Sequence, residues 1–82
     1  QGVIDCVIES EDGSLHLIDY KTDRLTKEEL SDPTLAALRM KELHARQLYY
    51  YSLAVERIFG QKQSKVEVYS LALGDSVDVR LE

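Results

Sequence analysis

The sequence predicts an α/β domain in which one long helix covers a sheet, with the elements in the order ββαββ. Two stretches of alternating apolar residues, each with a turn signal inside it, flank a long segment that contains no helix breaker. No internal repeat, low-complexity tract or linker divides the 82 residues. Because the sequence opens on Gln1 and runs directly into an apolar segment, we expect residues 1–82 to be part of a single larger domain.

The first hairpin is expected from strands at about residues 2–10 and at Leu15–Lys21. Both stretches alternate between two faces, and Glu11–Gly13 separates them with turn-forming residues. A three-residue loop with Gly13 in the left-handed conformation would pair positions whose numbers add up to 24. A two-residue Asp12-Gly13 loop would shift the pairing by one residue and reverse the faces. We favour the three-residue loop.

This register determines which charged side chains meet. It places Asp5 directly opposite Asp19, with Lys21 two residues further along the same face. Opposed carboxylates repel each other unless a cation lies between them, and Mg²⁺ prefers such oxygen ligands. The alternative is a solvated sheet face on which the carboxylates only form salt bridges with Lys21. The two-residue loop would pair Asp5 with Tyr20 instead and separate the two carboxylates.

Helix signals occupy the middle of the chain. Thr26, followed three residues later by Glu29, resembles a capping box for one short helical turn. Asp32-Pro33 then supplies an N-cap and a first residue for a long helix that nothing interrupts before Gly60. Alternating residues at 65–73 and 76–81, on either side of a Gly-Asp turn, predict a closing hairpin.

The periodicity of the long helix predicts which of its faces meets the sheet. The members of that face are Ala36, Met40, Leu43, His44, Gln47, Tyr51, Ala54, Val55 and Ile58. Gln47 is polar within this face and Tyr51 lies one turn later, so an amide and a phenol can point to the same place. The alternative is that Gln47 bonds to a backbone group at the sheet edge and that Tyr51 is part of the core.

Composition narrows the class of protein. No apolar run approaches the roughly 20 residues of a membrane span, and no signal peptide is recognisable, so we expect a soluble, cytoplasmic protein. One cysteine, Cys6, allows no internal disulfide and supplies at most one thiolate ligand. A net charge of -5 argues against a broad basic surface for nucleic acid.

Three motifs in order give the sequence a family resemblance. Gly2-Val3-Ile4-Asp5, Asp19-Tyr20-Lys21-Thr22 and Gln47-Leu48-Tyr49-Tyr50-Tyr51 resemble the G-x-I-D, D-Y-K-T and Q-x-x-x-Y motifs of RecB-family nucleases in the PD-(D/E)XK superfamily. The run from Asp19 to Arg24 is especially similar to the C-terminal nuclease domain of AddA, one component of bacterial AddAB helicase–nucleases. The resemblance covers residues 2–51. It implies a restriction-endonuclease-like mixed sheet within a nuclease domain whose upstream helix and strands lie outside residues 1–82.

The resemblance also implies an activity and a set of site residues. The activity is Mg²⁺-dependent hydrolysis of DNA, with Mn²⁺ as a possible substitute, by an exonuclease. The catalytic residues that the resemblance implies are Asp5, Asp19 and Lys21. The implied metal ligands are Asp5, Asp19 and the Tyr20 carbonyl. The implied supporting or DNA-positioning residues are Gln47, Tyr51 and Thr22. Lys21 would orient the attacking water and stabilise the charge on the phosphate.

The same resemblance implies partners. A helicase would deliver single-stranded DNA during double-strand-break repair and recombination. ATP would act only through a helicase domain outside these residues. An AddB-like subunit would complete the complex. The family commonly adds a histidine ligand on a helix ahead of the first motif. His16 and His44 do not match that position and are interpreted as structural. Residues 1–82 therefore lack this metal ligand, which is a reason for the isolated segment to be inactive. The alternative is a non-catalytic nuclease-fold module for DNA handling or subunit contact.

Overall fold

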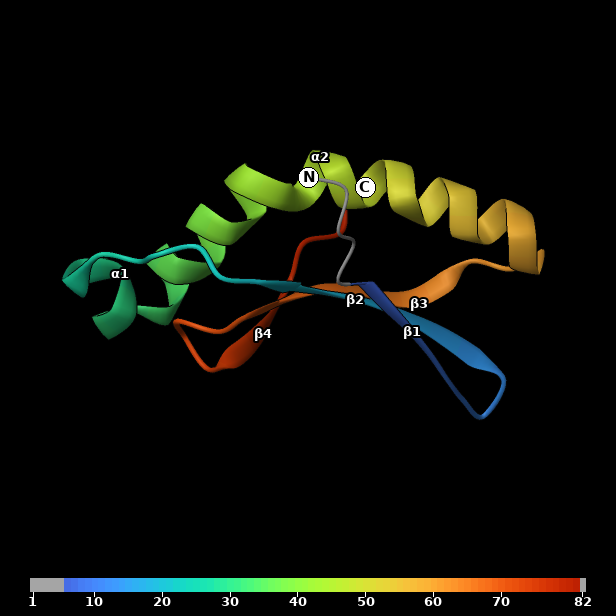
Figure 1. Ribbon diagram of the computed structural model, residues 1–82, viewed down its shortest axis with the longest axis horizontal. Helices are drawn as coiled ribbons and strands as arrows, with labels where there is room; N and C mark the ends of the chain where they lie inside the picture. Colours follow the sequence, from blue (N-terminus) through green and yellow to red (C-terminus); the bar gives the residue numbers. More distant parts are fainter. Residues whose placement is uncertain (1–5, 82) are drawn as a thin grey trace.

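A computed structural model describes residues 6–81, which form a four-stranded mixed sheet with one long helix across it (Figure 1). The elements in chain order are β1 (Cys6–Glu11), β2 (Ser14–Lys21), α1 (Lys27–Ser31), α2 (Pro33–Phe59), β3 (Gln63–Ser70) and β4 (Asp75–Asp78). The sheet order is β1-β2-β3-β4. The predicted α/β class, with a long helix packed on a sheet, is confirmed, and α1 is an additional short helix.

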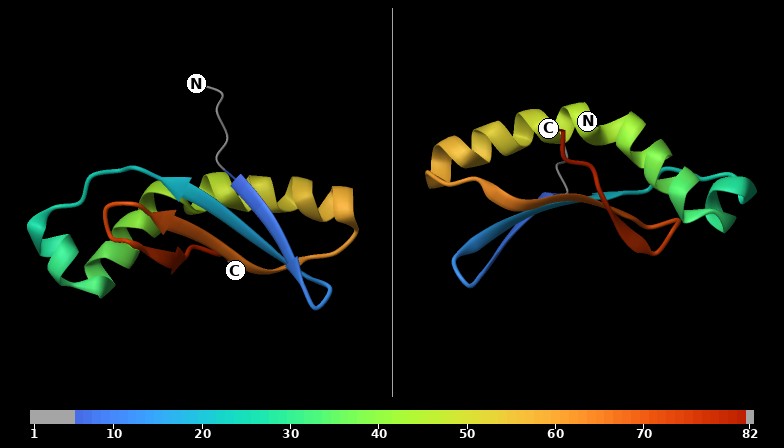
Figure 2. Two further views of the ribbon diagram at one scale, coloured as in Figure 1. Left: turned by 60° about the horizontal axis from the view of Figure 1, so that its bottom comes forward. Right: turned by 180° about the vertical axis from the view of Figure 1, so that it is seen from behind.

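The connection between β2 and β3 determines the architecture. These two strands are parallel, whereas β1 pairs with β2 and β3 pairs with β4 in the antiparallel sense. Parallel neighbours need a crossover, and α1 and α2 provide it. Figures 1 and 2 show α2 lying over one face of the sheet, while no helix of the described residues covers the opposite face.

The turn of the first hairpin differs from the prediction. Glu11 pairs with Ser14, so the loop contains only Asp12 and Gly13, and the numbers of paired residues add up to 25. The expected three-residue loop and its register are therefore wrong. Asp12 has a φ of 58° and Gly13 a φ of 79°. Two positive φ values define a turn whose twist matches that of the flanking strands, and Asp-Gly is among the sequences that adopt it most readily.

The helix boundaries agree with the sequence signals. A carboxylate oxygen of Asp32 accepts a hydrogen bond from the Thr34 backbone N–H at 3.0 Å, and α2 begins at Pro33. The helix ends at Gly60, which is left-handed with a φ of 71°. Thr26 and Glu29 form the predicted reciprocal capping box in front of α1. In the described part of the chain, neither helix combines the length and apolar character needed to cross a membrane.

The closing hairpin is shorter than predicted. Strand β3 ends at Ser70, because the Gly74 N–H donates to the Ser70 carbonyl at 2.8 Å and the Leu73 N–H donates to the Ser70 hydroxyl at 3.1 Å. These two bonds close a turn within residues that the alternation assigned to a strand. Strand β4 then pairs with β3 only over residues 75–78.

The core lies between α2 and the covered face of the sheet. Its buried members are Leu17, Met40, Ala45, Leu48, Val66, Val68, Val77 and Val79. Of these, Met40, Ala45 and Leu48 come from α2, and Ala36 is also fully buried. Two members of the helix face were missed by the periodicity, Ala45 and Leu48. Conversely, Leu43, Gln47, Ala54 and Ile58 were predicted to face the sheet and are exposed.

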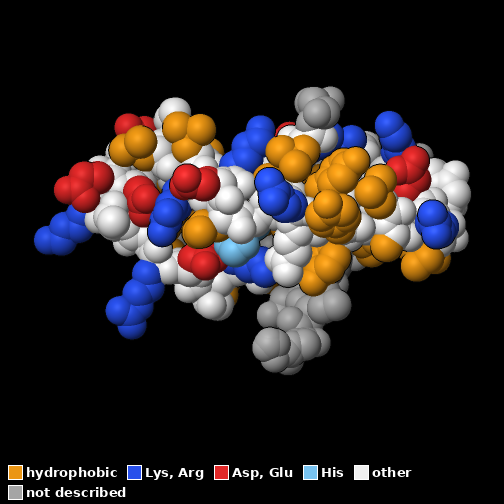
Figure 3. Space-filling model, turned by 90° about the horizontal axis from the view of Figure 1, so that it is seen from above, with side chains coloured by type: hydrophobic (Ala, Val, Ile, Leu, Met, Phe, Trp, Pro, Cys, Tyr) orange, Lys and Arg blue, Asp and Glu red, His pale blue; other side chains and the backbone are white. Residues whose placement is uncertain are grey.

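The wrong helix face has a physical cause. The outward side of α2 is also apolar, as the space-filling view from above shows (Figure 3). The exposed large apolar side chains of α2 are Leu35, Leu38, Leu43, Tyr49, Tyr50, Leu53, Ile58 and Phe59. A helix that is apolar on both sides has no single stripe that identifies the buried face. The buried stripe is rotated toward Ala45 and Leu48, which are buried together with Ala36 and Met40.

Candidate functional site

Asp19 and Lys21 lie together at the end of β2, on the face that packs beneath α2. Leu15, Leu17 and Asp19 are alternately buried along this strand. The Lys21 Nζ lies 3.1 Å from Asp19 Oδ2, and the two side chains are 24% and 3% exposed. An almost completely buried carboxylate therefore has one ammonium neighbour, which remains partly accessible to solvent.

The buried oxygen of Asp19 is incompletely satisfied. Asp19 Oδ2 is within ion-pair distance of Lys21, but it has no hydrogen-bond partner among the residues that the structure describes. Burying a charged oxygen without a hydrogen bond is unfavourable, and such exceptions call for an explanation such as an ion that binds there. A carboxylate oxygen is the kind of ligand that Mg²⁺ prefers, so Asp19 fits a divalent cation.

The structure does not supply the predicted second carboxylate. Asp5 lies outside the described residues, and the residue opposite Asp19 is Cys6. The register that was expected to oppose the two carboxylates is therefore wrong. Among residues 6–81 no three His, Cys, Asp or Glu side chains gather where they could hold a metal ion. The role of Asp5 as a ligand stays a prediction from the family resemblance.

Tyr20 and Thr22 occupy different positions from Asp19 and Lys21. The ring of Tyr20 packs against Tyr69 of the neighbouring strand, with ring centroids 5.6 Å apart. Thr22 is the first residue after β2 and is exposed. The carbonyl of Tyr20 as a metal ligand and the contact of Thr22 with DNA stay predictions.

Gln47 connects Lys21 to the helix. The Lys21 ammonium donates a hydrogen bond to Gln47 Oε1 at 3.2 Å, and Gln47 Nε2 donates to the Tyr51 hydroxyl at 3.3 Å. Tyr51 is half-buried and packs against the core. Neither of these bonds of Gln47 goes to a backbone group at the sheet edge. A polar series of four side chains thus runs from Asp19 through Lys21 and Gln47 to Tyr51.

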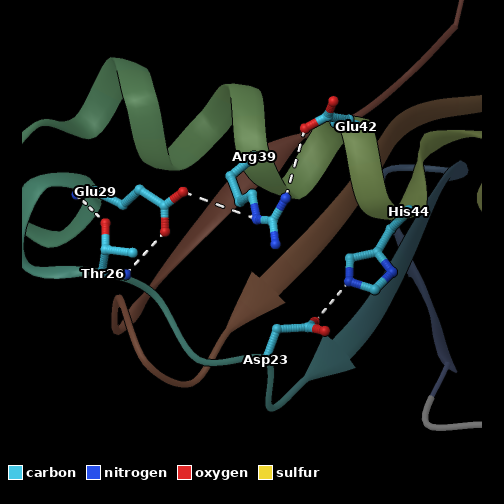
Figure 4. Close-up of polar contacts among 6 residues, drawn as sticks. All are labelled: Asp23, Thr26, Glu29, Arg39, Glu42 and His44. Atoms are coloured by element: carbon cyan, nitrogen blue, oxygen red, sulfur yellow. Dashed lines mark hydrogen bonds and ion pairs between the residues drawn. The ribbon is translucent and has the colours of Figure 1, made fainter.

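A second contact between the same two segments was not predicted. His44 Nε2 lies 2.6 Å from Asp23 Oδ2, and Figure 4 shows the two side chains meeting between α2 and the loop after β2. The interpretation of His44 as structural did not identify this partner. The signal was present in the sequence, because Asp23 extends the motif that begins at Asp19 and His44 lies one turn before Gln47.

Comparison with known proteins identifies the family. The family model of the PD-(D/E)XK nuclease superfamily matches residues 1–79, nearly the whole chain. The chain belongs to this superfamily. Asp19-Tyr20-Lys21 fits the (D/E)XK part of the superfamily name, and the structure brings Asp19 and Lys21 of this motif together with Gln47.

Curated relatives place the chain more closely. It is 42% identical over 69 residues to the AddA subunit of the ATP-dependent helicase/nuclease of Lysinibacillus sphaericus, covering 84% of the chain and 6% of that protein. The corresponding protein of Moorella thermoacetica is 44% identical over 71 residues, covering 87% of the chain and 4% of that protein. That of Thermoanaerobacter pseudethanolicus is 37% identical over 78 residues, covering 95% and 6%. The chain therefore spans only a small part of these relatives. No solved structure matches it significantly.

Proposed function

We propose that this chain carries the metal-dependent site of a DNA nuclease with a restriction-endonuclease-like fold. The observation that supports this most is the geometry of Asp19, Lys21 and Gln47. A buried carboxylate oxygen that has no hydrogen-bond partner among residues 6–81 lies 3.1 Å from an ammonium, which is in turn held by an amide from the covering helix. An arrangement of one acidic ligand and one fixed cation suits a reaction in which negative charge develops on a phosphate.

Asp19 would hold the metal ion, together with Asp5 and the Tyr20 carbonyl as the resemblance implies. Mg²⁺ is the expected ion, with Mn²⁺ as a substitute of similar ligand preference. When bound, the ion would polarise a phosphoryl oxygen and make a bound water more acidic.

Lys21 would act directly on the reacting groups. In phosphodiester hydrolysis, a water oxygen forms a bond to phosphorus, the bond from phosphorus to one sugar oxygen breaks, and that oxygen is finally protonated. The ammonium of Lys21 would donate hydrogen bonds to the water or to a phosphate oxygen and so stabilise the added negative charge. Gln47 would orient this ammonium, Tyr51 would support Gln47, and Thr22 would contact DNA.

The relatives suggest the setting of this reaction. Their name describes a helicase/nuclease component that depends on ATP. We infer that this module trims single-stranded DNA that a helicase domain elsewhere in the same protein delivers, during double-strand-break repair and recombination in the bacterial cytoplasm. The helicase domain would use the ATP, and an AddB-like subunit would be the protein partner. The net charge of -5 suits this division, because the basic DNA-binding surfaces would belong to other domains.

The test compares Asp19→Asn with the wild type in the complete protein that contains this chain. We expect Asp19→Asn to lose Mn²⁺ binding at this site in a calorimetric titration and to abolish Mg²⁺-dependent hydrolysis of linear DNA. Glu42→Gln, at an exposed carboxylate of α2, is the matched control and should change neither measurement. Unchanged Mn²⁺ binding and DNA hydrolysis in Asp19→Asn would support the alternative, a non-catalytic nuclease-fold module for DNA handling or subunit contact.

A further inference from the structure

The position of Lys21 depends on the separation between the end of β2 and α2. Its ammonium contacts Asp19 on its own strand and Gln47 on the helix, at 3.1 and 3.2 Å. Hydrogen bonds weaken quickly with distance, so a shift of the strand end by about 1 Å would break the contact with the helix. Whatever holds the strand end against α2 therefore also determines where the ammonium lies.

Apolar packing holds this region only in part. Within the sheet, α2 packs chiefly against β3 and β4, which are the two strands farthest from β1 in the strand order. Leu17 joins β2 to the core further back along the strand, and Leu25 contacts the core after the chain has left the sheet. Between these two residues, Lys21 and Asp23 contact α2 through polar groups.

Two polar contacts lie side by side at this place. Lys21 bonds to Gln47, and Asp23, two residues later, contacts His44, three residues earlier on the helix. Residues three apart on a helix are neighbours on its surface. The Asp23–His44 contact is therefore the next connection between the two segments, directly beyond the one that holds the ammonium.

The Asp23–His44 contact is stronger than the other charged contact to this segment. It is 2.6 Å long, and its side chains are 33% and 13% exposed. Arg39 lies 3.8 Å from Glu29 and 3.7 Å from Glu42, and its side chain is 45% exposed (Figure 4). Short hydrogen bonds to a carboxylate are strong, whereas long exposed ion pairs contribute little. Arg39 is thus a matched comparison, because it also joins α2 to the segment after β2.

We propose that Asp23 and His44 are a positioning pair that keeps the Lys21 ammonium in place for the reaction. The Nε2–H of His44 donates to the Asp23 carboxylate and holds the loop after β2 against α2. Neither side chain needs to touch DNA or the metal ion. This inference rests on the proposed nuclease function and adds two residues to it.

The test uses the complete protein and variants that separate ring volume from hydrogen bonding. His44→Phe keeps the ring but removes the donor, whereas His44→Gln restores an N–H donor close to the position of Nε2. Asp23→Ala removes the acceptor at a more exposed position, and Arg39→Met is the control. We measure kcat and KM for Mg²⁺-dependent hydrolysis of single-stranded DNA, and hydrogen exchange in α2 as a check of folding.

We expect His44→Phe and Asp23→Ala to lower kcat by about tenfold or more while KM for DNA changes less than about twofold, because a misplaced reacting group affects the transition state more than binding. His44→Gln should recover most of kcat, and Arg39→Met should match the wild type. The proposal is overturned if His44→Phe leaves kcat unchanged, if His44→Gln is as impaired as His44→Phe, or if only KM rises. Normal hydrolysis by Asp19→Asn would instead refute the proposed function itself.

Discussion

Replacing Lys21 by methionine removes the ammonium and keeps the aliphatic chain, and it should affect stability and activity in different ways. At 3.1 Å and an effective dielectric constant of about 20, the attraction between Lys21 and Asp19 is about 5 kcal/mol before desolvation is counted. Breaking a buried ion pair typically lowers stability by about 3–5 kcal/mol. Because the Lys21 side chain is 24% exposed, we expect a smaller loss of about 2 kcal/mol in the absence of metal.

In Lys21→Met, the affinity for Mn²⁺ should rise, whereas the rate of DNA hydrolysis should fall. Without its ammonium neighbour, the Asp19 carboxylate attracts a cation more strongly, so Lys21→Met should bind Mn²⁺ more tightly than the wild type. Hydrolysis of DNA should nevertheless fall by about 10²–10³-fold, since a group that stabilises developing charge has been removed. Binding of Mg²⁺ should also restore part of the lost stability, because the ion binds only the folded site.

Three measurements on the complete protein test this reasoning. Hydrogen exchange in peptides from β2, with and without Mg²⁺, reports the local stability, titration reports Mn²⁺ affinity, and degradation of linear DNA reports activity. Lys41→Met, at an exposed position of α2, is the control. If Lys21→Met degrades DNA at the wild-type rate, or binds Mn²⁺ more weakly than the wild type, the assigned role of the ammonium is refuted.

Three further substitutions test separate parts of the account. Gln47→Leu should lower kcat by about three- to tenfold, less than Lys21→Met, because the ammonium remains and only the hydrogen bonds of Gln47 to Lys21 and Tyr51 are lost. An equal loss in both variants would contradict a supporting role. Leu48→Ala should destabilise the domain by about 2–4 kcal/mol, and Leu43→Ala by less than about 1 kcal/mol, because Leu48 is buried and Leu43 is exposed. Hydrogen exchange measures both losses, and the reverse order would show that the helix face is assigned wrongly. Gly13→Ala should lower the stability of the hairpin by about 1 kcal/mol through the positive φ alone, since no atom lies within 4 Å of the added methyl group. Unchanged hydrogen exchange in the hairpin would argue against the two-residue turn.

Local signals were sufficient for the boundaries of the helices. The caps at Thr26 and Asp32 and the helix end at Gly60 depend on interactions within a few residues, and they occur where the sequence predicted them. The turn at Asp12-Gly13 was also predictable from its own residues, because both can adopt positive φ. The three-residue loop was favoured because it brought Asp5 opposite Asp19, and that expectation about the site led to the wrong register.

Contacts between distant segments could not be derived from periodicity. The face of α2 that is buried depends on how the helix is placed over the sheet, and the apolar residues on its outward side conceal this choice. The Asp23–His44 contact depends on where the loop after β2 crosses the helix. By contrast, the pairing of Asp19 with Lys21 follows from two-residue alternation along one strand, which is why this part of the site could be predicted.

The central claim is that the Asp19 carboxylate, beside Lys21, binds a divalent cation for hydrolysis of DNA. The most direct measurement is anomalous X-ray scattering from Mn²⁺ in crystals of the complete protein. The account predicts a manganese peak within about 2.5 Å of an Asp19 carboxylate oxygen, with Asp5 as a second ligand. A manganese ion bound elsewhere while Asp19 keeps only its contact with Lys21 would contradict the claim.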